Sequence, residues 1–255
     1  MEETKNYTYR MIIAYDGTEY HGWQVQLTHT TVAGLLIQTF QSVFNQPCVL
    51  LGASRTDSGV HAYGQVARLR TPFCIDGDDM KRILNNALPE SVFVREITAV
   101  APEFHPHVGV QSKEYWYHLF TQRPLPFFSR FGWFPEYESR KIDWSVFKEA
   151  LQLFVGEHDF ASFCRNEEGK STRRSVDAIE VRELPRYKAL RVVIKGKGFL
   201  QYQIRRMVGA AITVASRESV SLDDIRRLLT KPEKLTIALH KAKAQGLLLR
   251  RISYE

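Results

Sequence analysis

Residues 52–61, with the sequence GASRTDSGVH, place an arginine and a carboxylate between two glycines, with a histidine two residues after the second glycine. They directly follow the apolar run VLL, which has the character of a strand. Glycines around charged residues are typical of a tight loop that presents side chains for catalysis or binding. Asp57 in such a loop can act as a nucleophile, a general base or an electrostatic stabiliser. The same residues also fit a surface turn with an Arg55–Asp57 pair, and His61 fits either an acid/base role or a backbone hydrogen bond.

Aromatic and basic residues elsewhere suit contacts with RNA. The segment KEYWY at 113–117 alternates as a strand, so Tyr115 and Tyr117 share one face and Trp116 takes the other. Such a face serves either as a stacking surface for a base or as part of an aromatic core. Residues 15–24, YDGTEYHGWQ, form a second polar and aromatic loop that can line a cleft or contact RNA.

Two adjacent arginines lie in the helical pattern GKGFLQYQIRRMVG. Neighbouring side chains on a helix point about 100° apart. One of Arg205 and Arg206 can therefore pair with an acid while the other meets solvent or phosphate. Two solvated arginines are the simpler interpretation of the same pattern.

The elements that must position these residues follow one order in the first half of the chain. Hydrophobic periodicity and turn signals predict strand, helix, strand, strand, helix and strand over 7–16, 31–44, 49–51, 64–69, 77–87 and 92–100. This order matches the split βαβ arrangement of ferredoxin-like folds. The second half has a similar cadence, with strands at 113–121, 176–183, 190–195 and 247–254 and helices at 143–155, 200–217 and 221–229. We therefore expect an α+β fold of two pseudo-symmetric ferredoxin-like (RRM-like) halves, with mainly antiparallel sheets side by side, helices on one face and a cleft between the halves.

Composition and charge narrow the class of protein. The 255 residues are 44% hydrophobic and 25% charged, which is ordinary for a globular chain, and no apolar run reaches the length of a membrane helix. The polar N-terminus does not resemble a signal peptide, so we expect a cytoplasmic protein without membrane contact. Three widely spaced cysteines, and the absence of paired Cys/His spacing, argue against disulfides and a metal site.

The charge is unevenly distributed along the chain. Residues 1–105 carry 8 Lys+Arg and 11 Asp+Glu, a net charge of −3, whereas residues 106–255 carry 27 and 17, a net charge of +10. A basic half favours a polyanionic partner. We expect an N-terminal α+β domain over 1–105 that carries the catalytic loop, and a basic α+β domain over 106–255 that completes the cleft and binds RNA.

Six segments together resemble the TruA family of tRNA pseudouridine synthases. Residues 54–67, SRTDSGVHAYGQVA, resemble its catalytic motif GRTDxGVHAxGQV. The loop YDGTEYHGWQVQ, the strand KEYWY, and the segments GEHDFASF, 198–209 and 246–254 resemble the family's other motifs, in the same order over 9–254. Ser54 and Ser58 stand where the family usually has Gly and Ala, and Ala33 and Gln201 also depart from its pattern.

The resemblance implies roles for particular residues. Asp57 would be the catalytic aspartate, Tyr115 would stack on the extruded uracil, and Arg205 would pair with Asp57. Arg55 would enter the RNA and help displace the target nucleotide. His61, Lys113 and Arg206 are further RNA-binding candidates.

The resemblance also implies an activity and partners. The family isomerises uridine to pseudouridine at positions 38, 39 and 40 of the tRNA anticodon arm, without a cofactor or catalytic metal, and bacterial members are homodimers. Two other function classes remain open. One is a non-catalytic RNA-binding protein with the same fold. The other is a carboxylate glycosidase, which normally needs two carboxylates where the motif supplies one.

Overall fold

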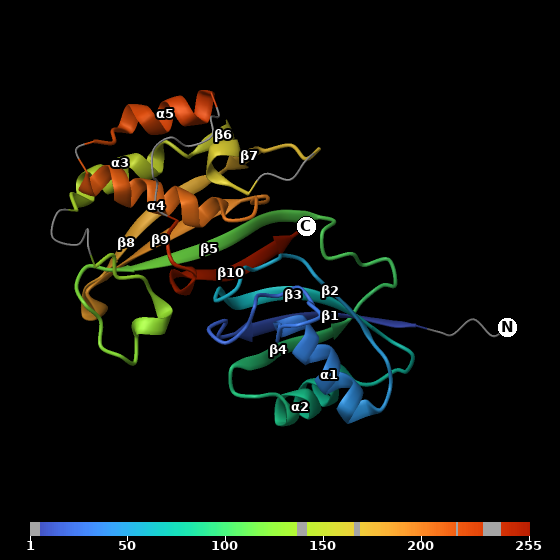
Figure 1. The fold of residues 1–255 in the computed structure, drawn as a ribbon. Helices are drawn as coiled ribbons and strands as arrows, with labels where there is room; N and C mark the ends of the chain where they lie inside the picture. Colours follow the sequence, from blue (N-terminus) through green and yellow to red (C-terminus); the bar gives the residue numbers. More distant parts are fainter. Residues whose placement is uncertain (1–5, 137–141, 166–168, 218, 232–240) are drawn as a thin grey trace. The chain divides into compact units, whose positions relative to one another are not determined.

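The computed structural model describes residues 6–136, 142–165, 169–217, 219–231 and 241–255 (Figure 1). The chain divides into two compact units, Met1–Gln111 with Leu248–Glu255, and Ser112–Leu247. The domains expected from the sequence, 1–105 and 106–255, have other bounds than these units. The boundary falls six residues later, and the last eight residues belong to the first unit.

The first unit is built on a mostly antiparallel sheet. Its elements are β1 (Tyr7–Tyr15), α1 (Val32–Phe44), β2 (Val49–Gly52), β3 (His61–Thr71), α2 (Gly77–Ala87) and β4 (Val92–Ala99). β1 lies between β4 and β3 and is antiparallel to both. β2 pairs with β3, also in the antiparallel direction. The final strand, β10 (Leu247–Tyr254), pairs with the start of β3 in parallel. Both helices lie on one face of this sheet (Figure 1).

Local sequence explains these elements. In β1 the residues Tyr9, Met11, Ile13 and Tyr15 are buried and alternate with more accessible ones, as expected of a strand with one face against a core. The Thr31 hydroxyl accepts a hydrogen bond from the N–H of Gly34 and caps α1. The Asp76 carboxylate caps α2 in the same way through the N–H groups of Asp78 and Asp79.

The described residues of the second unit form a set of adjacent antiparallel strands, a separate hairpin and three α-helices. Among the adjacent strands, β9 (Ala189–Gly196) lies between β5 (Val110–Phe120) and β8 (Ala178–Leu184), antiparallel to both. β6 (Gly156–Asp159) and β7 (Arg173–Val176) form a separate hairpin. The helices are α3 (Trp144–Gln152), α4 (Gln203–Ser216) and α5 (Leu222–Thr230), of which α3 and α4 lie along one face of the adjacent strands (Figure 1).

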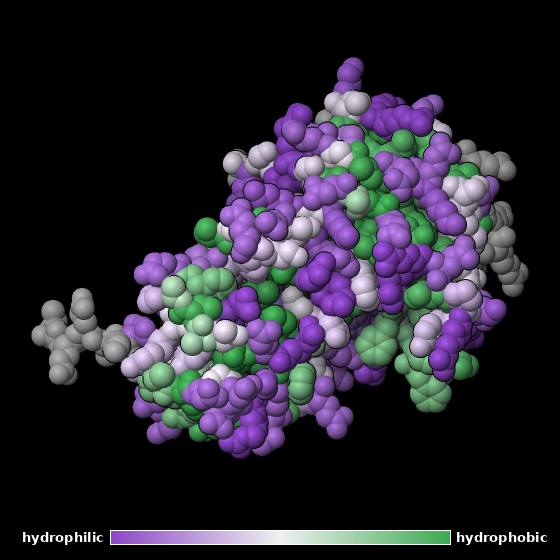
Figure 2. All heavy atoms as spheres, turned by 180° about the vertical axis from the view of Figure 1, so that it is seen from behind, coloured by the Kyte–Doolittle hydropathy of each residue, from purple (hydrophilic) through white to green (hydrophobic). Residues whose placement is uncertain are grey.

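The mixed α and β composition and the mainly antiparallel pairing are as predicted from the sequence. Every predicted helix and strand is present, whereas β6 and β7 were not predicted from the sequence. The long helix begins at Gln203 rather than residue 200 because Tyr202 has left-handed backbone angles, with φ of +67°. Within the described ranges, no helix is both long enough and apolar enough to cross a membrane. The face of the molecule shown in Figure 2 mixes hydrophilic and hydrophobic side chains.

Candidate active site

The loop that connects β2 to β3 carries the carboxylate singled out in the sequence. Along this loop, Ser54 and Thr56 are buried, Arg55 is exposed and Asp57 is partly exposed. The alternation directs the arginine and the aspartate outward while their neighbours hold the loop. The arrangement suits a loop that presents charged groups to a ligand.

Thr56 is the inner anchor of the loop. Its hydroxyl lies 2.8 Å from the Tyr15 hydroxyl, and its carbonyl accepts a hydrogen bond from the backbone N–H of Trp23 at 3.1 Å. The Trp23 ring is 3% exposed and stacks on Tyr15 with their centroids 6.1 Å apart. The loop that begins at Tyr15 therefore supports the residue beside Asp57, so its motif and the catalytic-type motif form one substructure.

Gln65 holds the other side of the loop. This side chain is fully buried and its amide makes two hydrogen bonds with Ser54, accepting from the backbone N–H at 3.3 Å and donating to the carbonyl at 2.6 Å. Ser54 itself is not among the residues with positive φ in the described chain. The serine at this position therefore fits the backbone without strain, although the family usually has glycine there.

Gly22 is required where the aromatic loop meets the catalytic loop. Its φ is +89°, and a Cβ at this position would lie 2.5 Å from the Thr56 carbonyl oxygen and 3.1 Å from the Asp57 carbonyl carbon. Both atoms are backbone, so neither can swing aside as a flexible side chain would. A larger residue at 22 must displace the segment that carries Asp57.

We expect Gly22→Ala to lower activity more than stability alone would explain. Left-handed backbone at a non-glycine residue costs about 1–2 kcal/mol, and the clash with Thr56 adds displacement of the Asp57 loop. The pseudouridine formation that the family resemblance implies should fall at least ~10-fold at a temperature where the variant is folded. The matched control is Gly109→Ala, because Gly109 has φ of +71° and no atom within 4 Å of the added Cβ. Equal activity in the two variants would contradict this role for Gly22.

His61 is built into the support of the loop. It is 4% exposed, and its Nδ1 accepts a hydrogen bond from the N–H of Gly17 at 3.0 Å. A carboxylate oxygen of Asp16 lies 3.1 Å from the same nitrogen. These contacts connect the turn after β1 to the end of the catalytic loop, and the predicted RNA contact of His61 stays a prediction.

Tyr115 lies on β5 of the second unit. It is 6% exposed and meets the Phe199 ring edge-on, with the centroids 5.4 Å apart. Tyr117, on the same face, is fully buried and donates its hydroxyl to the Lys243 carbonyl at 2.7 Å. Burial raises the pKa of the Tyr117 phenol well above its usual value. The expected common face of the two tyrosines is thus the core face of the strand.

The adjacent arginines of α4 differ in their surroundings. Arg205 is 9% exposed, its Nε donates to the Ala242 carbonyl at 2.9 Å, and its own carbonyl accepts from the N–H of Ala242 at 3.0 Å. Arg206 donates to the Cys164 carbonyl at 2.6 Å. A buried guanidinium is rare unless it is hydrogen-bonded, so Arg205 is not the solvated arginine of the simpler interpretation.

Lys113 lies on β5, two residues before Tyr115, and the pKa of its ammonium group is shifted. Burial lowers the pKa of its ammonium group to about 8, because desolvation penalises the charged form. The side chain is therefore largely charged at neutral pH and largely neutral two pH units higher.

If Lys113 contacts a phosphate, tRNA affinity should fall as the pH rises from 7 to 9, because the charged form that binds is lost on deprotonation. Lys113→Arg should flatten this part of the profile, since arginine stays charged throughout. Binding isotherms at several pH values and constant ionic strength would measure the effect. An unchanged slope in Lys113→Arg would remove Lys113 from the RNA contacts.

The candidate residues fall into two groups. Arg55, Asp57 and His61 lie together on and beside one loop of the first unit, whereas Lys113, Tyr115, Arg205 and Arg206 belong to the second. Their action on one nucleotide stays a prediction. In the part of the chain that the structure describes, no three His, Cys, Asp or Glu side chains group closely enough to hold a metal ion.

Several supporting residues were not identified from the sequence. Thr56 and Gln65 hold the loop through buried contacts, and both lie inside the catalytic-type motif. The loop that contains Trp23 was predicted to line a cleft or contact RNA, and not to support the Asp57 loop. The signal that could have identified its supporting role was the joint occurrence of two motifs far apart in the chain.

Comparisons with known proteins identify the family of the chain. Residues 11–107 and 150–255 match the family model described as tRNA pseudouridine synthase. A tRNA pseudouridine synthase A 1 of Protochlamydia amoebophila is 32% identical over 97% of this chain and 96% of its own length. A tRNA pseudouridine synthase A of Leuconostoc citreum is 34% identical over 96% of both.

Among solved structures, an H/ACA RNP bound to a substrate RNA containing 2'-deoxyuridine aligns with 80% of this chain and 43% of its own, at a TM-score of 0.37 and 12% identity. That likeness is too weak to carry an argument. The family match and the curated relatives are sufficient by themselves, because the family model covers most of the chain, including the loop with Asp57 and the helix with Arg205, and each relative covers nearly all of it. This chain belongs to the TruA family of tRNA pseudouridine synthases.

Proposed function

We propose that this protein isomerises uridine to pseudouridine at positions 38, 39 and 40 of the tRNA anticodon arm. The observation that carries the proposal is the loop of Asp57. This family motif presents its carboxylate beside the exposed Arg55, on a backbone that buried Thr56 and Gln65 anchor. The reaction is inferred from membership of the family, and the anchored loop holds a carboxylate that can catalyse it.

The reaction sets clear chemical demands. The N1–C1′ bond of the target uridine breaks, the uracil turns, and C5 forms a new bond to C1′ while C5 loses its proton and N1 gains one. The net change is an isomerisation, so no electrons enter or leave. The enzyme must take the nucleotide out of its stack, place a carboxylate near sugar and base, and keep the detached uracil bound.

Named residues meet these demands in our proposal. Asp57 is the catalytic carboxylate. It attacks the uracil ring, attacks C1′, or only removes the proton from C5. Arg55 is exposed next to it and enters the RNA in place of the displaced nucleotide. Tyr115 stacks on the uracil from a ring oriented by Phe199.

Arg205 is proposed to keep Asp57 ionised. Its burial and its bond to the Ala242 carbonyl hold the guanidinium in one orientation, which a flexible surface arginine would lack. His61, Lys113 and Arg206 are proposed to contact RNA around the target nucleotide, and no cofactor takes part.

We also propose that the two halves are pseudo-symmetric and ferredoxin-like, with the cleft that the sequence predicts. The element order supports this, because β1, α1, β2, β3, α2 and β4 are repeated in kind by β5, α3, β8, β9, α4 and β10, with the hairpin β6–β7 and the helix α5 inserted. Homodimer formation and a place in the cytoplasm belong to the proposal on the strength of the family alone.

The loss of the C5 proton gives a direct assay. The purified protein is incubated with tRNA whose uridines carry tritium at C5, and release of tritium to water is measured together with free uracil. We expect tritium release without free uracil. Tight tRNA binding without release would favour the non-catalytic RNA-binding protein, and free uracil as the product would favour a glycosidase.

tRNA binding should weaken steeply with salt. Residues 106–255 carry a net charge of +10, and each phosphate that they neutralise releases condensed counterions. The logarithm of the affinity should fall linearly with the logarithm of the salt concentration, with a slope of several units. A flat dependence, measured by filter binding between low and physiological salt, would count against RNA as the partner.

A further inference from the structure

An aromatic ring with two arginines lies on the first unit, on the strand that directly follows the Asp57 loop. Tyr63 of β3 is 43% exposed. The guanidinium carbon of Arg95 lies 3.9 Å from the centre of its ring, and that of Arg250 lies 4.3 Å from it. Arg95 also donates a hydrogen bond to the Tyr63 carbonyl at 2.9 Å. Three strands, β4, β3 and β10, thus each contribute one member of this Tyr63 cluster.

The cluster lies on the sheet face opposite α1 and α2. Ala62 pairs with buried Tyr15 and is itself 3% exposed. The register of β1 and β3 shifts at this point, and Tyr63, the next residue, is exposed on the other face. Leu249 pairs with Ala62 and is fully buried, so Arg250 also points away from it. The outer face is therefore where both side chains meet.

Further arginines share this face. Arg10 of β1 lies opposite Arg68 of β3. Two residues further along, Thr8 lies opposite Arg70, so Arg70 is on the same face as Arg68. Like charges directly across two strands destabilise a sheet. Glu96 offsets Arg10 at 2.8 Å, while Arg68 and Arg70 donate to the carbonyls of the 102–104 segment. Residues 1–105 are acidic overall, yet this face gathers positive charge.

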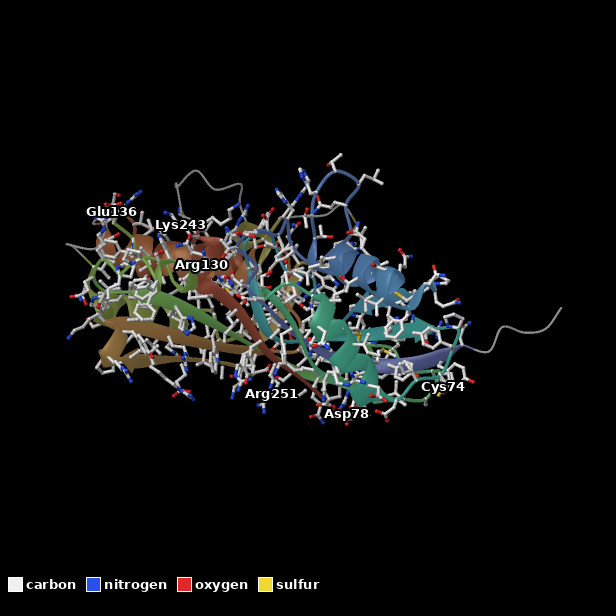
Figure 3. All side chains as sticks on the ribbon, turned by 90° about the horizontal axis from the view of Figure 1, so that it is seen from below. Cys74, Asp78, Arg130, Glu136, Lys243 and Arg251 are labelled. Carbon is white, nitrogen blue, oxygen red and sulfur yellow. The ribbon has the colours of Figure 1, made fainter. Side chains whose placement is uncertain are left out.

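The neighbouring residue of β10 is also a surface arginine. Arg251 follows Arg250 on β10, and its side chain lies at the surface (Figure 3). On the second unit, an arginine also lies over an aromatic ring, but there a carboxylate offsets its charge. Arg191 lies 3.9 Å from the Trp116 ring, but the Trp116 N–H donates to Glu114 at 2.7 Å, so a carboxylate is part of that group.

We infer that the Tyr63 cluster is a second RNA-contacting surface, which binds tRNA phosphates and an unpaired or terminal base outside the target nucleotide. Guanidinium groups donate to phosphate in a planar, two-pronged way, and an exposed aromatic ring with arginines beside it offers planes on which a base can stack. Cation–π contact with Tyr63 holds the guanidiniums in place before RNA arrives. The inference rests on the proposed function for the identity of the RNA.

The test measures tRNA binding and pseudouridine formation by the Arg95→Ala/Arg250→Ala double variant. We expect affinity at ~0.1 M salt to fall about tenfold or more, and the slope against salt to become shallower by about 1 to 2. KM should rise while kcat at saturating tRNA stays within about twofold, because neither arginine is part of the proposed catalytic group. Tyr63→Phe should bind as the wild type does, and Tyr63→Ala should bind more weakly.

The matched control is Arg82→Ala/Arg182→Ala, which removes the same charge from arginines that pair with Asp79 and Glu180. Equal weakening in both double variants would overturn the inference, since it would show an effect of net charge alone. So would unchanged binding by Arg95→Ala/Arg250→Ala. A change from dimer to monomer in sedimentation would instead make this face a contact between two copies of the chain. If the wild type forms no pseudouridine, the proposed function fails, whereas the binding comparison still decides the role of the cluster.

Discussion

Asp57→Asn is expected to abolish pseudouridine formation while tRNA binding is kept. The amide has the shape of the carboxylate but carries no negative charge and cannot act as a nucleophile or a general base at neutral pH. A loss of at least ~10³-fold in kcat is expected, in the range that removal of an acid/base or nucleophilic group produces. Single-turnover measurements with excess enzyme would isolate this loss from effects on product release.

The fold should tolerate this change. Thr56 and Gln65 hold the loop through their own hydrogen bonds, so its anchors remain when the Asp57 charge is removed. tRNA affinity should stay within a few-fold of the wild type, because the substitution removes a negative charge near a polyanion. Asp79→Asn is the control, since Asp79 is a surface carboxylate of the same unit paired with Arg82. More than a tenth of wild-type activity in Asp57→Asn would remove Asp57 from the catalytic role.

Tyr115→Leu is expected to have the second largest effect. Stacking of one base on an aromatic ring contributes about 1–3 kcal/mol, so kcat/KM should fall roughly 5- to 150-fold when the ring is lost. The ring also packs on Phe199, so the variant is measured well below its melting temperature. Leucine keeps the apolar character of the position but offers no plane to the uracil.

Tyr115→Phe separates the ring from the hydroxyl. KM should stay within about twofold of the wild type because the stacking plane is kept, and any fall in kcat then measures what the hydroxyl contributes. Tyr117→Phe is the control for loss of a hydroxyl in the same strand, since that group binds the Lys243 carbonyl in the core. Two Tyr115 variants that both keep wild-type kcat/KM would exclude Tyr115 from the site.

Much of the fold was readable from the sequence because its signals are local. The cap residues Thr31, Asp143 and Ser221 stand directly before helices, and each accepts the expected backbone N–H bonds. Strands with one buried face show alternation, as in β1. β6 and β7 were missed because each has four residues, which is too short for a period of two to stand out.

The supports of the candidate site were harder to predict because they join residues far apart in the chain. Tyr15 meets Thr56 across 41 residues, and Gln65 reaches back 11 residues to Ser54. The burial of Arg205 follows from α4 being enclosed on nearly all sides, which the helical pattern does not show. The left-handed Tyr202 had no signal either, since this conformation is ordinarily taken by glycine or asparagine.

The most direct test of the central claim is a map of pseudouridine in unmodified tRNA after incubation with the purified protein. The proposal predicts pseudouridine at positions 38, 39 and 40 wherever a uridine stands there, and none in the same tRNA incubated with Asp57→Asn. Unchanged uridine at all three positions, in tRNA that the wild-type protein binds tightly, would contradict the account.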